Sequence, residues 1–163
     1  MLSAALFCLV VAISDGDTLK VRCGEPGAFR QLTVRLHAID APELNQPFGR
    51  RAKQALSQFT YLKTARLDCE HDEDRYQRRV CRVQVAPNSC TDARCAKTLD
   101  AGLAMLTVGM AWWSRAYADE QSRTERSRYE FAEVEAKAKR AGLWADRRPV
   151  PPWRWRAEHP RPR

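Results

Sequence analysis

Several common sequence features are absent from this chain of 163 residues. It has no Cys-x-x-Cys pair and only three scattered histidines, so zinc is a minor alternative for its six cysteines. No internal repeat is present, and the only segment of biased composition is the C-terminal end. The apolar start, MLSAALFCLVVAIS, is too short to span a bilayer and lacks the basic residues that open an export signal. We therefore expect residues 1–7 at most to be the remnant of a trimmed signal.

Positive charge is abundant but unevenly distributed. The formal net charge is +8, and residues 147–163 hold six arginines against one glutamate, which leaves +3 for the rest of the chain. A basic chain suits a polyanionic partner such as nucleic acid, although an arginine-rich end also serves solubility alone. Because prolines punctuate RPVPPWRWRAEHPRPR, we expect an extended arm over 147–163 without further helix. We expect this arm to tether nucleic acid electrostatically and to take no part in the site.

The even number of cysteines and their positions favour disulfides over free buried thiols. A hairpin that turns on Asp15-Gly16, where glycine accepts the positive φ of a tight turn, places Cys8 directly opposite Cys23. Opposed residues of an antiparallel pair lie within disulfide range. The other cysteines flank two short loops, and the predicted bridges are Cys8–Cys23, Cys69–Cys81 and Cys90–Cys95. Three bridges imply an oxidising compartment, so we expect a periplasmic or secreted protein.

The periodicity of the apolar residues predicts five strands and three helices. Strands are expected over 8–14, 18–23, 32–40, 65–70 and 78–85. Helices are expected over 48–59, around 99–106, and in a longer stretch that ends near residue 144. Five strands with a helix between the third and the fourth is the element order of an OB-type barrel. We therefore predict an α+β fold, a five-stranded OB-fold barrel with three helices, over residues 8–146.

Charged side chains gather at the predicted strand ends and turns. The carboxylates are Asp17, Asp40 and Glu43, and the guanidiniums are Arg35 and Arg78. Carboxylates alone would repel one another, whereas a hard cation such as Ca²⁺, bound by oxygen ligands, removes that repulsion. Two arginines and a divalent cation also stabilise the negative charge that builds up during phosphodiester hydrolysis. Strict alternation places Arg35 and Asp40 on opposite faces, so we expect a bend at Ala41-Pro42, or a bulge, to re-aim one of them.

These motifs occur in a specific order and spacing. The pattern DGDT…VRLHAIDAPE…DRYQRR resembles the staphylococcal nuclease (thermonuclease) family, and the similarity runs from about Val10 to Trp144. The resemblance implies an OB-fold barrel with three helices. It also implies Ca²⁺-dependent hydrolysis of DNA and RNA that leaves 3′-phosphate ends. We expect the chain to act on these substrates as a monomer without a membrane partner.

Carried over residue by residue, the resemblance implies a role for each charged group. Asp17, Asp40 and the backbone carbonyl of Ala41 correspond to the metal ligands. Arg35 and Arg78 correspond to the arginines that clamp the phosphate, and Glu43 corresponds to the general base. The residues implied to contact the nucleic acid are Arg75, Tyr76, Arg79 and Tyr117. The family often has glycine on both sides of the second arginine, where this chain has Gln77 and Arg79.

Two other functions stay open at this point. Degenerate members of this fold bind nucleic acid without cutting it, so a catalytically inactive OB-fold nucleic-acid-binding module is the main alternative. Loss of a carboxylate, of Arg35 or of Arg78 would indicate that alternative, and all of them are present. A disulfide-stapled protein-interaction domain is the third candidate, but it does not predict a cluster of complementary charges.

Overall fold

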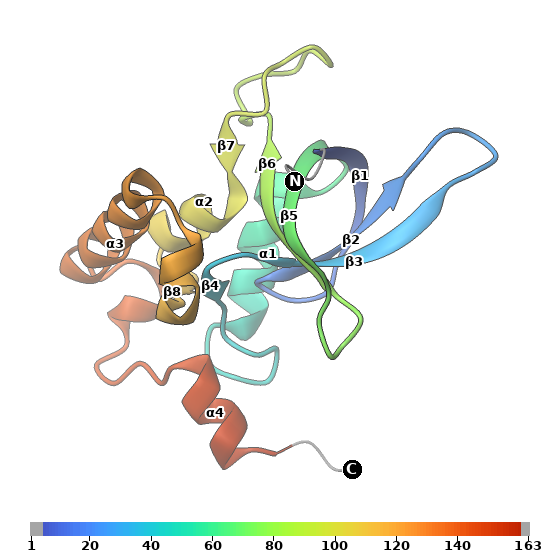
Figure 1. Cartoon of the computed structure of the whole chain (residues 1–163). Coiled ribbons are helices and arrows are strands. Elements are labelled where there is room, and N and C mark those ends of the chain that lie inside the picture. The colour runs from blue at the N-terminus through green and yellow to red at the C-terminus, as the bar shows by residue number, and fades with distance from the viewer. Residues whose placement is uncertain (1–4, 161–163) are drawn as a thin grey trace.

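A closed barrel of five strands forms the centre of the computed structural model (Figure 1). The structure describes residues 5–160, except for the side chains of His71 and Asp72. The barrel strands are β1 (Leu6–Ile13), β2 (Thr18–Cys23), β3 (Arg30–Leu36), β5 (Thr64–Glu73) and β6 (Arg79–Val85). They lie in the order β3-β2-β1-β5-β6, and parallel pairing of β3 with β6 closes the barrel. The predicted OB-fold barrel within an α+β fold is confirmed.

Helices and short strands surround this barrel. The helices are α1 (Gly49–Thr60), α2 (Ala101–Thr107), α3 (Arg123–Ala138) and α4 (Pro152–Glu158), with 3-10 turns η1 (Arg115–Glu120) and η2 (Gly142–Ala145). The short strands are β4 (Ile39–Asp40), which pairs with β8 (Trp112–Trp113), and β7 (Leu99–Asp100), which pairs with β6. The three predicted helices correspond to α1, α2 and α3. Leu99 was expected in a helix but lies in β7, because Asp100 caps α2 by accepting from the backbone N of Leu103 at 3.1 Å.

The first hairpin has the predicted cysteine register but a different turn. Cys8 lies opposite Cys23, and a bulge between Val10 and Ala12 then shifts the register, so that a longer loop over 14–17 replaces the expected two-residue turn. Gly16 is not among the residues with positive φ. A Cβ at Gly16 would instead lie 2.6 Å from the Cβ of Ala52 and 2.7 Å from that of Ala41. Glycine is needed here because the loop packs directly against α1 and the segment after β4.

All three predicted disulfides are present. Cys8–Cys23, Cys69–Cys81 and Cys90–Cys95 have Cα–Cα distances of 4.4, 4.0 and 6.3 Å. No cysteine is free. The bridges therefore exclude the zinc and free-thiol interpretations, and the first two join neighbouring barrel strands.

The barrel interior shares the main hydrophobic core with α1, α2 and the first part of α3, and a smaller cluster lies between the end of α3 and η2. Inward-facing residues of the first three strands, among them Val10, Val21 and Val34, are completely buried. The apolar stripe predicted for α1 packs against them through Ala52 and Leu56, which are also completely buried. The loops at the strand ends are therefore mounted on a well-packed frame, as a precise site requires.

The C-terminal segment is not the extended arm that was expected. Residues 152–158 form α4, which lies beside the loop that joins β4 to α1 (Figure 1). Pro152 is tolerated because it occupies the first turn, where the missing N–H has no intrahelical partner to lose. No proline interrupts the six residues that follow it in α4, so the helix can form. The end of the predicted arm, residues 161–163, lies outside the described residues.

The N-terminal strand starts slightly earlier than predicted. β1 begins at Leu6, which pairs with Leu67 of β5. The expectation for residues 1–7 falls partly on residues 1–4, which lie outside the described residues. Within residues 5–160, no helix is long and apolar enough to cross a membrane.

Candidate active site around Asp17, Arg35 and Asp40

Three elements bring a guanidinium between two buried carboxylates. The β1–β2 loop carries Asp17, β3 carries Arg35 and β4 carries Asp40. Nη2 of Arg35 lies 3.7 Å from Oδ2 of Asp17 and 3.5 Å from Oδ1 of Asp40. The two aspartates are only 6% and 5% exposed. Like-charged carboxylates can share this space because the buried arginine lies against both.

A left-handed residue aims Asp40 at Arg35. Ala38, between β3 and β4, has a φ of 61° and reverses the alternation of the strand. The sequence predicted a bend at Ala41-Pro42 or a bulge, and the positive φ lies earlier, at Ala38. The backbone at Ala38 turns first, because β4 leaves the barrel to pair with β8.

Burial and neighbouring charges shift the pKa values of the groups in this cluster. Burial disfavours charged Arg35, but the carboxylates of Asp17 and Asp40 outweigh it and raise the pKa of the guanidinium. Burial raises the pKa of Asp40, and bonds from Arg156 offset only part of that effect. Burial, together with the charge of Asp17, also raises the pKa of Asp15 to about 7. Perturbed pKa values of this kind are concentrated at functional sites.

Asp17 is held firmly by its neighbours. Its Oδ1 accepts from the hydroxyl of Thr18 at 2.8 Å, and its Oδ2 accepts from the backbone N of Ala41 at 2.9 Å. Asp15 supports the same loop, because its Oδ1 accepts from the backbone N of Asp17 at 3.1 Å. Ala41, predicted as a backbone ligand, thus lies directly beside Asp17.

The loop that carries Glu43 is fixed by backbone contacts. The backbone N of Glu43 donates to Oε1 of Gln46 at 3.1 Å, and the backbone N of Gln46 donates to the carbonyl of Glu43 at 2.8 Å. A Cβ on Gly49 would lie 1.8 Å from that carbonyl, so only glycine lets the start of α1 pack so closely. Neither Gln46 nor Gly49 was predicted as a site residue from the sequence. The feature of the sequence that could have indicated this contact was a side-chain amide three residues after Glu43.

Arg156 of α4 is the site residue that the sequence analysis missed. Its Nη2 donates to Oδ2 of Asp40 at 2.8 Å, and its Nη1 donates to Oδ1 of Asp40 at 3.1 Å and to Oε1 of Glu43 at 3.0 Å. The expectation that the C-terminal arm takes no part in the site is therefore wrong. Folding as a helix turns one arginine of the arm toward the carboxylates. Pro152 followed by six residues without proline or glycine was the signal for that helix.

Arg78 lies in a different environment, at the tip of the β5–β6 hairpin. Its Nε and Nη2 contact Oδ2 of Asp74 at 3.0 and 2.9 Å, and its guanidinium stacks over Tyr76 at 5.0 Å from the ring centroid. Arg75 covers the same ring at 4.9 Å. Gln77 takes the position of the family's glycine with a φ of 57°. The structure thus groups Arg75, Tyr76 and Arg78 with one another and not with the buried carboxylates.

The remaining predicted contacts are distributed around the cluster. Arg79 opens β6 and is half-buried, with its backbone paired to that of Val34. Tyr117 lies in η1, where its ring contacts that of His37 at a centroid distance of 4.9 Å. Tyr117 is also close enough to Arg35 to influence its pKa. Tyr117 therefore neighbours the site, and Arg79 lies on the strand that pairs with the strand of Arg35.

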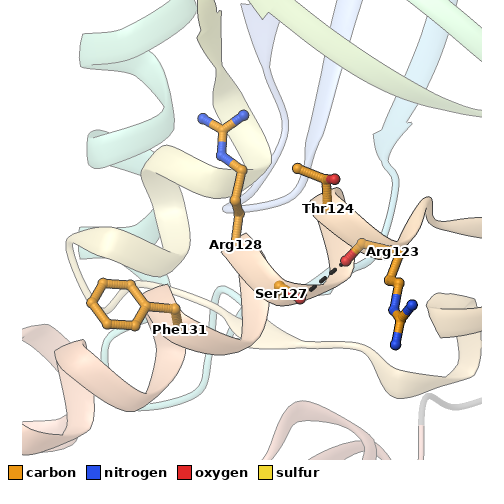
Figure 2. Close-up of a pocket in the computed structure, with 5 residues that line it drawn as sticks. All are labelled: Arg123, Thr124, Ser127, Arg128 and Phe131. Carbon is orange, nitrogen blue, oxygen red and sulfur yellow. Dashed lines mark hydrogen bonds between the residues drawn. The ribbon is translucent and has the colours of Figure 1, made fainter.

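A separate hollow of about 490 Å³ lies along α3 (Figure 2). Its lining residues are Arg123, Thr124, Ser127, Arg128 and Phe131. The hydroxyl of Ser127 donates to the carbonyl of Arg123 at 3.0 Å within the helix. None of the predicted site residues lines this hollow. Among the described residues, no three His, Cys, Asp or Glu side chains are grouped so that they could hold a metal ion.

Comparison with known proteins places the chain in a family. A model of the family described as "Staphylococcal nuclease homologue" matches residues 33–146. The chain belongs to the staphylococcal nuclease family. The matched range includes Arg35, Asp40, Glu43 and Arg78, whereas Asp17 lies before it.

Curated relatives of this staphylococcal nuclease homologue extend over most of the chain. An "Uncharacterized endonuclease" of Haemophilus influenzae is 38% identical over 93% of this chain and 73% of its own length. "Protein ParB" of Escherichia coli is 39% identical over 91% of this chain and 78% of its own. A "Micrococcal nuclease" of Shigella flexneri is 37% identical over 90% of this chain and 78% of its own. These alignments cover more of the chain than the family match.

Proposed function

We propose that this protein is a Ca²⁺-dependent nuclease that hydrolyses phosphodiester bonds of DNA and RNA and leaves 3′-phosphate ends. Membership of the family and the nuclease names of two relatives support nuclease activity. The observation that carries the proposal is the buried cluster in which Arg35 lies between Asp17 and Asp40. A binding module would gain nothing from burying two carboxylates at the point where an anionic substrate must lie.

The donor atoms suit a hard divalent cation. Asp17 and Asp40 offer carboxylate oxygens and Ala41 offers a backbone carbonyl, and these are the ligands that Ca²⁺ prefers. Two guanidiniums already lie against Asp40, which shows that this position accepts positive charge. When bound, the cation would neutralise charge on the phosphate in the transition state. These three residues are the proposed metal ligands.

The chain's own side chains carry the remaining steps. Arg35 binds a phosphate oxygen and stabilises the charge that develops on it. The carboxylate of Glu43 takes a proton from the attacking water, since its loop is rigidly held beside Asp40. Arg78 contributes a second clamp by exchanging its carboxylate partner, Asp74, for the phosphate, since an oxygen of either group accepts the N–H groups of the guanidinium.

The disulfides bear on where this activity takes place. Three bridges in 163 residues persist only under oxidising conditions. We propose that the protein works in the periplasm or outside the cell. Two of the bridges close the hairpins whose loops carry Asp17 and Arg78.

A cleavage assay tests the proposal. The purified protein is incubated with single-stranded DNA, double-stranded DNA and RNA in the presence of Ca²⁺, Mg²⁺ or a chelator, with Asp40→Asn as the matched variant. We expect cleavage with Ca²⁺, loss of cleavage with the chelator or the variant, and products that a 3′-phosphatase can modify. Binding of all three substrates without cleavage under any condition would instead identify the inactive binding module.

A further inference from the structure

The contact between Arg156 and the site carboxylates has a consequence for metal binding. We propose that Arg156 acts as an internal cation that competes with the divalent cation for Asp40, so that the C-terminal helix lowers the metal affinity of the site and leaves it when the metal binds. This inference rests on the divalent-cation site proposed above. It makes Arg156 a residue that sets metal affinity, not one that touches the substrate.

Arg156 occupies the carboxylate oxygens of Asp40, which is one of the proposed metal ligands. Both oxygens of Asp40 accept from Arg156, at 2.8 and 3.1 Å, and Glu43 accepts from the same guanidinium at 3.0 Å. A divalent cation needs direct contact with carboxylate oxygens at roughly 2.3–2.6 Å. A positive charge already bound there repels a second one. Removing it should therefore strengthen the attraction of the site for a metal ion.

The helix that presents Arg156 is held by few contacts. Nε2 of Gln46 donates to the carbonyl of Val150 at 2.6 Å, and Nε1 of Trp155 donates to Oδ1 of Asn45 at 3.3 Å. The rings of Trp153 and Trp112 meet edge to face at 5.5 Å.

The helix itself is short and exposed. α4 has seven residues, fewer than an isolated helix needs for stability in water. The side chain of Arg156 is 45% exposed, so its ion pairs are screened by solvent. The helix can therefore dissociate without disturbing the barrel.

The chain supplies a matched control on the same helix. Among the residues that the structure describes, the side chain of Arg154 pairs with Glu158 of α4, at 3.0 Å, and is 70% exposed. Arg154→Gln removes the same charge as Arg156→Gln without touching the site carboxylates. Arg156→Lys is a third variant, which keeps the charge but loses the bidentate fork.

The experiment measures Ca²⁺ binding by calorimetry in the absence of nucleic acid. We expect Arg156→Gln to bind Ca²⁺ about tenfold more tightly than wild type, with Arg156→Lys in between and Arg154→Gln unchanged. Amide hydrogen exchange over residues 152–158 is measured in parallel, with circular dichroism to confirm folding. Saturating Ca²⁺ should accelerate exchange over these residues in the wild type and in Arg154→Gln.

Each other result contradicts the proposal. Equal or weaker Ca²⁺ binding by Arg156→Gln would overturn it, as would α4 protection that is unchanged by bound Ca²⁺ or no Ca²⁺ binding by any variant. Lower turnover of Arg156→Gln at saturating Ca²⁺, with unchanged Ca²⁺ affinity, would make Arg156 a substrate contact instead. Failure of the proposed function gives a different result. If Arg156→Gln binds Ca²⁺ more tightly but no protein cleaves nucleic acid, the nuclease proposal fails while the competition between Arg156 and Ca²⁺ is supported.

Discussion

The two arginines expected to clamp the phosphate lie in contrasting surroundings. Arg35 is 11% exposed and contacts Asp17 and Asp40, which come from two other elements of the fold. Arg78 is 24% exposed and contacts Asp74, four residues earlier in the same hairpin. The first pairing depends on the whole barrel, whereas the second is complete within a single loop. Two arginines with the same expected role in a sequence motif can therefore differ in burial and in the origin of their partners.

The difference defines a fixed part and an adjustable part of the site. Thr18 and Ala41 hold Asp17, and the Gln46 amide holds the Glu43 loop. The tip of the β5–β6 hairpin instead exposes Tyr76, at 60%, with two arginines stacked on its ring. Chemistry that needs accurate geometry belongs on the barrel, and contacts that adapt to a bound strand belong on the loop.

The largest effect should come from the fixed part. Glu43→Gln removes the proposed proton acceptor, so we expect single-turnover cleavage to fall by about 10²–10⁴-fold while binding of Ca²⁺ and a non-hydrolysable dinucleotide is retained. Glu130→Gln, an exposed change on α3, serves as the control. Cleavage by Glu43→Gln at nearly the wild-type rate would show that Glu43 only orders its loop.

The comparison between the arginines can be tested by stability. Arg35→Ala leaves two buried carboxylates without their shared partner, so we expect the free energy of unfolding to drop by about 3 kcal/mol. Arg78→Ala removes a half-buried pair that lies within one loop, and it should cost less, about 1 kcal/mol. Urea denaturation with the disulfides intact measures both. Equal losses in the two variants would remove the distinction between the fixed and the adjustable part.

The smallest expected effect is a gain in the hairpin loop. Gln77 has a φ of 57°, in the left-handed region that costs a non-glycine residue energy. Gln77→Gly should therefore stabilise the protein by roughly 0.5–1 kcal/mol, while Gln54→Gly in the exposed middle of α1 should destabilise it by about as much. Thermal unfolding of both variants provides the measurement. A loss of stability in Gln77→Gly would mean that contacts of the Gln77 side chain stabilise the protein by more than its positive φ destabilises it.

Local patterns in the sequence were sufficient for much of the fold. The hairpin register predicted that Cys8 faces Cys23, and the helical stripe predicted the buried face of α1 through Ala52 and Leu56. These features depend on residues that are close in the chain and follow strand or helix periodicity. The resemblance of the charged motifs to a known family identified Asp17, Arg35 and Asp40 as one group, and the structure brings these three together.

Tertiary structure decided how those residues meet. The periodicity of β3 does not reveal the left-handed turn at Ala38, and a turn motif does not reveal that Gly16 is needed for packing against Ala52. The pairing of Arg156 with Asp40 joins segments 116 residues apart. Local rules determine strands, helices and short bridges, because their energies depend on near neighbours. Contacts such as Arg156 with Asp40 depend on the path of the folded chain, and only the assembled structure specifies that path.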